Sequence, residues 1–252
     1  MVKVGLVGGS GLEKLNIIEN SREINVSTPY GPPSSSLYSG QIGPCEVVIL
    51  SRHGRDHTIP PSLVNNRANI AAFKELNCSH ILATTACGSL REEIKRGDFV
   101  IPDQFIDLTR RRHVTFYDEF EPGNAIHVPM ADPFSAYLRG LLIGSAQELG
   151  LRVHAQGTVV TIEGPRFSTR AESKMFRLLG ADIVNMSIAP EAALAFEAGI
   201  PYAAVALSTD YDAWKTDESS VTWDEVVSVF NKNIAQMSRL LLNVINQIKV
   251  QS

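Results

Sequence analysis

Short runs of apolar residues, each closed by glycine or by polar residues, recur along this chain and alternate with segments of helical spacing. The runs are rich in valine, isoleucine, leucine and alanine, which is typical of strands buried on both faces of a sheet. The pattern predicts strands at residues 2–7, 45–50, 80–84, 97–101, 153–161, 182–187 and 202–209.

Helices are predicted between these strands from the residues that begin and end helices. The expected helices cover 60–77, opened by a proline pair, 132–150, opened by Asp132 and Pro133, and then 169–180, 190–199 and 222–248. The third and fifth begin with capping boxes, Thr169 with Glu172 and Thr222 with Glu225. Strands alternating with helices predict an α/β fold, and the length suits a single domain over residues 1–252.

Composition and charge exclude several classes of function. The net charge of −4 favours no nucleic-acid partner, and the basic triplet at residues 110–112 is interpreted as a solvated face or a loop. No apolar run approaches the roughly 18 residues of a membrane span, and no signal peptide opens the chain, so we expect a cytoplasmic protein with no membrane partner. The three cysteines lack a CxxC pair, which predicts buried thiols rather than disulfides or a zinc site.

The residues of chemical interest follow the predicted strands. Because ligands of α/β proteins bind at strand ends, we expect these residues to converge on one site. Some offer hydrogen-bond donors to an anion, others offer an apolar surface, and the last two are carboxylates. In chain order they are Ser10, Arg52, His53, Thr85, Ala86, Phe167, Ser168, Met186, Ser187, Asp210 and Asp212.

Most of these residues also have a purely structural interpretation. The glycine-rich turn at residues 8–11 is equally well explained as a tight turn, since Lys14 occupies the third glycine position of a dinucleotide fingerprint. Arg52 suits a salt bridge, and Ser168 suits a helix cap. Asp210 and Asp212 point the same way if the chain stays extended, but a DxD sequence more often caps backbone amides in a loop.

Seven segments that carry these residues span nearly the whole chain, at 7–12, 51–57, 84–93, 103–107, 161–168, 185–187 and 208–214. Their sequences, such as Ser51-Arg-His-Gly-Arg-Asp-His57 and Ser208-Thr-Asp-Tyr-Asp-Ala-Trp214, resemble the trimeric purine nucleoside phosphorylase family, and within it the 5′-methylthioadenosine phosphorylases. The resemblance implies a three-layer α/β/α fold with a mixed central sheet, and a homotrimer.

The resemblance also implies a role for each candidate residue. Phosphate, a co-substrate, would be bound by Ser10, Arg52, His53, Thr85, Ala86 and Ser187. The base would meet Phe167, Ser168, Asp210 and Asp212, the ribose would meet Met186, and His127 would reach the 5′ group of substrate in a neighbouring subunit. No metal and no other cofactor is implied. Ser10 and Ser187 replace the threonine of close relatives and keep its hydroxyl.

The implied reaction is phosphorolysis of 5′-methylthioadenosine to adenine and 5-methylthioribose 1-phosphate, in purine and methionine salvage. Asp210 is the expected general acid toward purine N7, a role that requires burial to raise its pKa. Carboxylates at 210 and 212 accept from the amino group of adenine, whereas a 6-oxopurine needs a donor. The alternatives are phosphorolysis of adenosine, inosine, guanosine or methylthioinosine, and nucleoside binding without catalysis.

Overall fold

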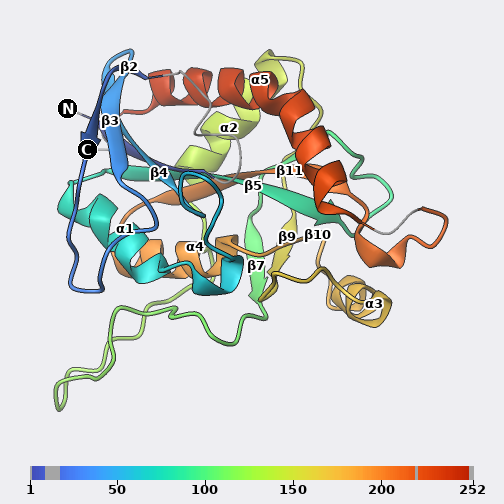
Figure 1. Cartoon of the computed structure of the whole chain (residues 1–252), viewed down its shortest axis with the longest axis horizontal. Helices are drawn as coiled ribbons and strands as arrows, with labels where there is room; N and C mark the ends of the chain where they lie inside the picture. The colour runs from blue at the N-terminus through green and yellow to red at the C-terminus, as the bar shows by residue number, and fades with distance from the viewer. Residues whose placement is uncertain (1, 9–17, 219–220, 250–252) are drawn as a thin grey trace.

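The computed structural model describes residues 2–8, 18–218 and 221–249, so Ser10 lies outside the described residues. Eleven strands of this part of the chain form one sheet (Figure 1). They are β1 (Lys3–Gly8), β2 (Glu19–Ile24), β3 (Leu37–Ile42), β4 (Cys45–Ser51), β5 (His80–Ser89), β6 (Phe99–Val100), β7 (Gln104–Asp107), β8 (Val153–His154), β9 (Thr158–Thr161), β10 (Ile183–Asn185) and β11 (Tyr202–Asp210).

The sheet is mixed, as the resemblance implied. Its path runs β2-β3-β4-β1-β5-β10-β9-β7, and β11 pairs with both β5 and β6. The β4-β1-β5-β11 centre is parallel, whereas β10 runs antiparallel to β5. Because the central strands are parallel, their carboxyl ends meet at one edge of the sheet, and this edge carries the site described below.

Helices cover both faces of the sheet and complete the predicted three layers (Figure 1). One face carries α2 (Ala136–Glu148) and α5 (Trp223–Gln247), and the other carries α1 (Asn66–Glu75) and α4 (Ile188–Glu197), while α3 (Arg170–Leu178) lies at one end. No helix among the described residues is both long and apolar enough to span a membrane.

The two faces of the central strands are both apolar because alternate side chains enter opposite cores. In β1, Val4 and Leu6 pack into the core with α2 and α5, whereas Val7 packs into the core with α1 and α4. In β11, Val205 packs into the core with α2 and α5, and Ala204 packs into the core with α1 and α4. The continuous apolar runs in the sequence therefore correspond to strands buried on both faces, as predicted.

Two helices begin later than predicted, in each case at a better cap. The chain at Pro61–Leu63 forms only a 3-10 turn, and α1 begins at Asn66, where the Asn65 side chain accepts from the amide of Ala68. The next helix, α2, does not begin at Asp132 either, because the Ser135 hydroxyl accepts from the Leu138 amide. Both predicted capping boxes, at the starts of α3 and α5, are confirmed.

Two strand predictions are corrected by the observed pairing, and three further strands were not predicted. The third strand extends beyond Thr84 to Ser89, because β11 pairs with it from Ile81 to Gly88 and β10 pairs with its last two residues. The run 153–161 divides into β8, which pairs with β6, and β9, which lies between β7 and β10. The polar strands β2, β3 and β7 were not predicted, since they carry no continuous apolar run.

A long segment between β7 and α2, residues 108–134, has neither helix nor strand. It extends away from the body of the molecule in Figure 1. The basic triplet lies here, so its interpretation as a loop is confirmed, whereas a solvated face does not describe Arg112, whose side chain is only 2% exposed. Arg112 pairs with Glu163 at 2.8 Å and donates to the carbonyl of Met186, which ties this segment to the strand ends.

Candidate active site

A cavity of about 150 Å³ opens where β4, β10 and β11 end against the second half of β5. Ten of the residues predicted from the sequence line it: Arg52, His53, Thr85, Ala86, Phe167, Ser168, Met186, Ser187, Asp210 and Asp212. These residues come from segments far apart in the chain, so the convergence predicted from the strand ends is confirmed as geometry.

One end of the cavity is built around the guanidinium of Arg52, which is 1% exposed. Its Nε and Nη2 atoms pair with the carboxylate of Glu191, and Nη1 donates to the Thr84 carbonyl at 2.9 Å. The hydroxyl of Tyr202 also donates to Glu191, at 2.8 Å. A guanidinium has five N–H donors, so this cation is fixed in place and keeps donors for a ligand. The predicted salt bridge and the predicted site role are therefore compatible.

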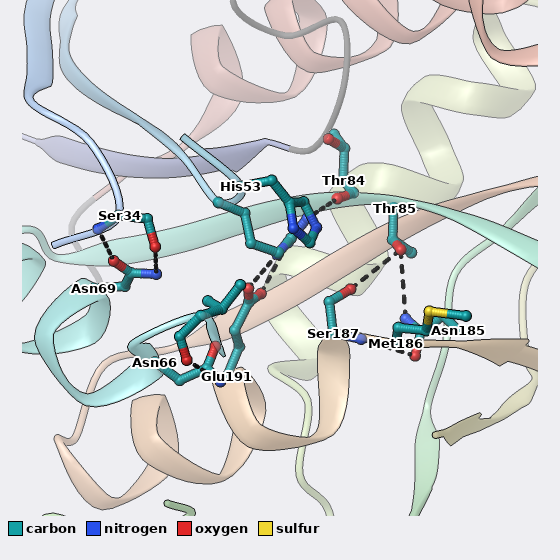
Figure 2. Close-up of polar contacts among 12 residues, drawn as sticks. Ser34, His53, Asn66, Asn69, Thr84, Thr85, Asn185, Met186, Ser187 and Glu191 are labelled. Carbon is teal, nitrogen blue, oxygen red and sulfur yellow. Dashed lines mark hydrogen bonds and ion pairs between the residues drawn. The ribbon is translucent and has the colours of Figure 1, made fainter. Parts of the chain in front are cut away.

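Two hydroxyls face each other beside this cation. The Thr85 Oγ1 and Ser187 Oγ atoms lie 3.3 Å apart, and Figure 2 shows them with Asn185. Ser187 occupies the N-cap position of α4, but its side chain makes no capping hydrogen bond. A fixed guanidinium, two hydroxyls and a helix N-terminus together form a site suited to an oxyanion.

The imidazole of His53 completes this end and is neutral near pH 7. Burial lowers its pKa to about 3, and the neighbouring Arg52 charge adds to the shift. The Nδ1 atom lies 2.9 Å from the carbonyl oxygen of Ile59, which can only accept, so Nδ1 carries the proton. Nε2 is therefore an acceptor and suits an anion that itself carries a proton, and His53 as a phosphate ligand stays a prediction.

The other end of the cavity holds the two carboxylates. Burial raises the pKa of Asp210 to about 6, with the charge of Asp212 adding to the rise. The Thr209 hydroxyl and the Asp212 amide, each 2.8 Å from an Asp210 oxygen, oppose it. An acid with a pKa this close to neutrality can give up a proton at physiological pH.

The chain does not stay extended through these carboxylates, so the condition for both side chains to point the same way is not met. The strand β11 ends at Asp210, and Asp212 has a left-handed φ of 47°. Asp210 caps the Asp212 amide, as the loop interpretation expected, and both carboxylates still line the cavity. A Cβ atom on Gly88 would lie 2.9 Å from Asp210 Oδ1, so the close approach of β5 requires glycine here.

The spacing of the two ends follows from β5, which runs along the cavity. Thr85 belongs to the oxyanion end, and Gly88 lies against Asp210 and Asp212. Three residues of strand at about 3.3 Å each separate the ends by roughly 10 Å. A ligand that spans this distance has an anion at one end and a group with hydrogen-bond donors at the other.

The wall between the two ends is apolar on one side. Met186 and Phe167 contribute to it, and Phe167 is 38% exposed at the mouth. Ser168 is not a helix cap, since Thr169 caps α3. Its hydroxyl lines the cavity and has no hydrogen-bond partner among the described residues.

Sequence reasoning missed a second wall, which comes from the first turns of α5. Trp223, Val226, Val227 and Phe230 line the cavity there. The Trp223 ring lies 5.0 Å from the ring of His57, which in turn lies 4.5 Å from that of His53. The capping box showed where α5 begins, but no local signal placed that helix over the strand ends.

His127 does not line this cavity. It lies in the 108–134 segment, edge-on to Phe120 at 5.8 Å between ring centroids. No group of three or more metal-ligating side chains is found in the described ranges.

A family model described as the phosphorylase superfamily matches residues 3–246. An S-methyl-5'-thioadenosine phosphorylase of Xenopus tropicalis is 53% identical over 251 residues, which cover 98% of this chain and 89% of that protein. The corresponding protein of Danio rerio is 52% identical over 249 residues, with the same coverage.

Solved structures show the same relationship. Methylthioadenosine phosphorylase from Schistosoma mansoni, in complex with adenine, matches with a TM-score of 0.94 at 43% identity, covering 100% of this chain and 93% of that one. A single-substitution variant of the Schistosoma mansoni adenosine/methylthioadenosine phosphorylase, in complex with methylthioadenosine, matches with a TM-score of 0.93 at 42% identity and the same coverage.

Proposed function

The chain belongs to the phosphorylase superfamily, and we propose that it catalyses phosphorolysis of 5′-methylthioadenosine, releasing adenine and 5-methylthioribose 1-phosphate. One observation carries the proposal. A single cavity holds a fixed guanidinium with two hydroxyls at one end and two buried carboxylates at the other. The end with the cation and hydroxyls suits phosphate, the carboxylate end suits a purine that offers hydrogen-bond donors, and the ribose fits between them.

In the proposed reaction, a phosphate oxygen attacks ribose C1′ as the bond from C1′ to purine N9 breaks. Arg52, Thr85, Ser187 and the amide near Ala86 hold the phosphate, with Ser10 as a further ligand. The bonding electrons pass to the purine, and Asp210 donates a proton to N7. Positioning the anion and protonating the leaving group both lower the barrier. Met186 lies under the ribose, and Phe167 packs on the base.

The same carboxylates support adenine as the leaving base. Adenine offers an amino group that carboxylates accept, whereas a 6-oxopurine presents an acceptor in that place. Ser168 would complete the contacts to the base edge. A site whose buried carboxylates accept from the adenine amino group disfavours a 6-oxopurine, because that base would leave the carboxylates without a donor.

The wall from α5 supports the methylthio group as the 5′ substituent. The side chains of Trp223, Val226, Val227 and Phe230 offer no charge and suit a thioether better than a hydroxyl. Adenosine is a second candidate substrate, because the related Schistosoma mansoni protein is named for both nucleosides.

Replacing Trp223 with alanine tests this wall. We expect KM for methylthioadenosine to rise by roughly tenfold or more, while KM for adenosine changes less, since only the thioether loses an apolar contact. Trp223→Phe, which keeps an aromatic ring, should retain most of the preference. An equal loss for both nucleosides would assign Trp223 to the fold rather than to the 5′ group.

The activity itself is tested by incubating the chain with methylthioadenosine with and without phosphate and measuring adenine. We expect release only with phosphate. Release without phosphate would identify a hydrolase, hypoxanthine from inosine would identify an inosine-type phosphorylase, and tight binding with no product would identify a nucleoside-binding protein.

Three further features belong to the proposal. The chain acts as one catalytic domain over residues 1–252, in a homotrimer whose neighbouring subunit receives His127 at the 5′ side of its substrate. The position of His127 outside its own cavity, on an extended segment, supports this arrangement. Three free buried cysteines favour a reducing compartment such as the cytoplasm.

A further inference from the structure

Three buried polar atoms at the carboxylate end of the cavity make no hydrogen bond of ordinary length and angle within the described part of the chain. They are Ser168 Oγ, Ser173 Oγ and Asp212 Oδ2. Ser173 is fully buried and Asp212 is 7% exposed. Ser168 and Asp212 line the cavity, whereas Ser173 does not.

The position of Ser173 follows from how α3 begins. Thr169 and Glu172 close the capping box, and the Ser173 amide bonds to the Thr169 carbonyl at 2.9 Å. The Ser173 hydroxyl is therefore not needed to cap the helix. It shares the buried face of α3 with Phe176, where a hydroxyl without a partner has an unfavourable desolvation cost.

The helix α3 packs against the 3-10 turn Asp212–Trp214, which brings the Ser173 hydroxyl close to the carboxyl of Asp212. Burial raises the pKa of Asp212, and the Ser173 and Ser168 hydroxyls act in the opposite direction. The acidic groups that act on Asp212 from its surroundings are Asp210, on β11, and Glu172, on α3. Both repel its negative charge, so the hydroxyls are the side chains that favour the ionised form.

We propose that Ser173 is a positioning residue that determines base specificity: its hydroxyl donates to Asp212 and holds that carboxylate as an acceptor toward the amino group of a 6-aminopurine. This inference rests on the proposed function. Without the hydroxyl, burial and the two neighbouring acids favour a protonated Asp212. A protonated carboxyl donates a hydrogen bond, which a 6-oxopurine accepts.

The test is Ser173→Ala, with kcat/KM measured from pH 5.5 to 8.5 for methylthioadenosine and for methylthioinosine, its 6-oxo counterpart. We expect the ratio between the two substrates to fall roughly tenfold at the acidic end, the size expected for losing a hydrogen bond to a charged group, and to recover as pH rises. Ser173→Cys, which keeps the volume with a weaker donor, should lie between.

Combining Ser173→Ala with Asp212→Asn tests whether Ser173 acts through Asp212. If Ser173 acts through Asp212, Ser173→Ala will leave the substrate ratio of Asp212→Asn unchanged. The inference would be overturned if Ser173→Ala lowered the melting temperature but left the ratio of kcat/KM for the two substrates unchanged at every pH. Failure of the original chain to release adenine would instead overturn the proposed function, so the two failures are distinguishable.

Discussion

Replacement of Asp210 by asparagine is expected to lower kcat for adenine release from methylthioadenosine by about two to four orders of magnitude, the usual contribution of a general acid. Asparagine keeps the shape of the side chain but has no acidic proton for N7. Its amide donates to a 6-oxo group, so activity toward inosine-like substrates should fall less. Initial rates with both substrate classes at saturating phosphate measure the difference.

The pH profile sharpens this expectation. The pKa of Asp210 is raised to about 6, so its protonated fraction falls as pH increases through 6 and by about tenfold for each further unit. The kcat/KM of the original chain should therefore decline on the alkaline side, and Asp210→Asn should lack this limb. Titration of His53, the other ionisable group of the cavity with a strongly shifted pKa, does not cause this alkaline decline, because His53 is already neutral throughout this pH range.

Asp132→Asn is a matched control for this experiment. It makes the same chemical change at an exposed residue that caps no helix, and we expect activity near that of the original chain. Adenine release that persists at the original rate in Asp210→Asn would assign the proton to another group and remove Asp210 from the mechanism.

The strand ends show why much of this site can be predicted from sequence. Strands buried on both faces leave a continuous apolar signal, so the points where β4, β10 and β11 end can be located closely. Polar residues at those points, such as Arg52 and Asp210, have few structural uses in an apolar context. Parallel strands then bring them to one edge without further information.

The residues supplied by helices could not be predicted in this way. Ser173 and Trp223 lie on helices whose limits were predicted, but the side of the sheet on which a helix packs depends on contacts between distant segments. The same limit applies to Arg112, whose side chain is buried in an ion pair with Glu163, a residue that follows a different strand end. Helix propensity and residue spacing describe local structure only. They cannot predict contacts between residues that are tens of positions apart in the chain, such as Arg112 and Glu163.

Glu191 is the clearest example of a residue that only the tertiary structure identifies. It is fully buried on the first turn of α4, and it pairs with Arg52 and accepts from the Tyr202 hydroxyl. The Glu191 carboxylate offsets the buried charge of Arg52 in the absence of phosphate. It also fixes the direction of the guanidinium, so one residue contributes to both the fold and the proposed phosphate site.

Replacing Glu191 with alanine is expected to destabilise the fold by about 3–5 kcal/mol, because it leaves the buried charge of Arg52 unpaired. Thermal unfolding should show a decrease of roughly 10 °C, and KM for phosphate should rise as Arg52 loses its orientation. Glu191→Gln, which keeps the shape and one acceptor, should cost less.

The double variant Arg52→Met with Glu191→Leu separates charge from structure. Removing both partners removes the unpaired charge, so stability should recover toward that of the original chain, since buried ion pairs are often replaced by apolar residues at little net cost. Activity should not recover, because the cation that holds phosphate is gone. Recovery of phosphorolysis in this double variant would show that phosphate is held elsewhere, and an unchanged melting temperature in Glu191→Ala would show that Arg52 is stabilised by other groups.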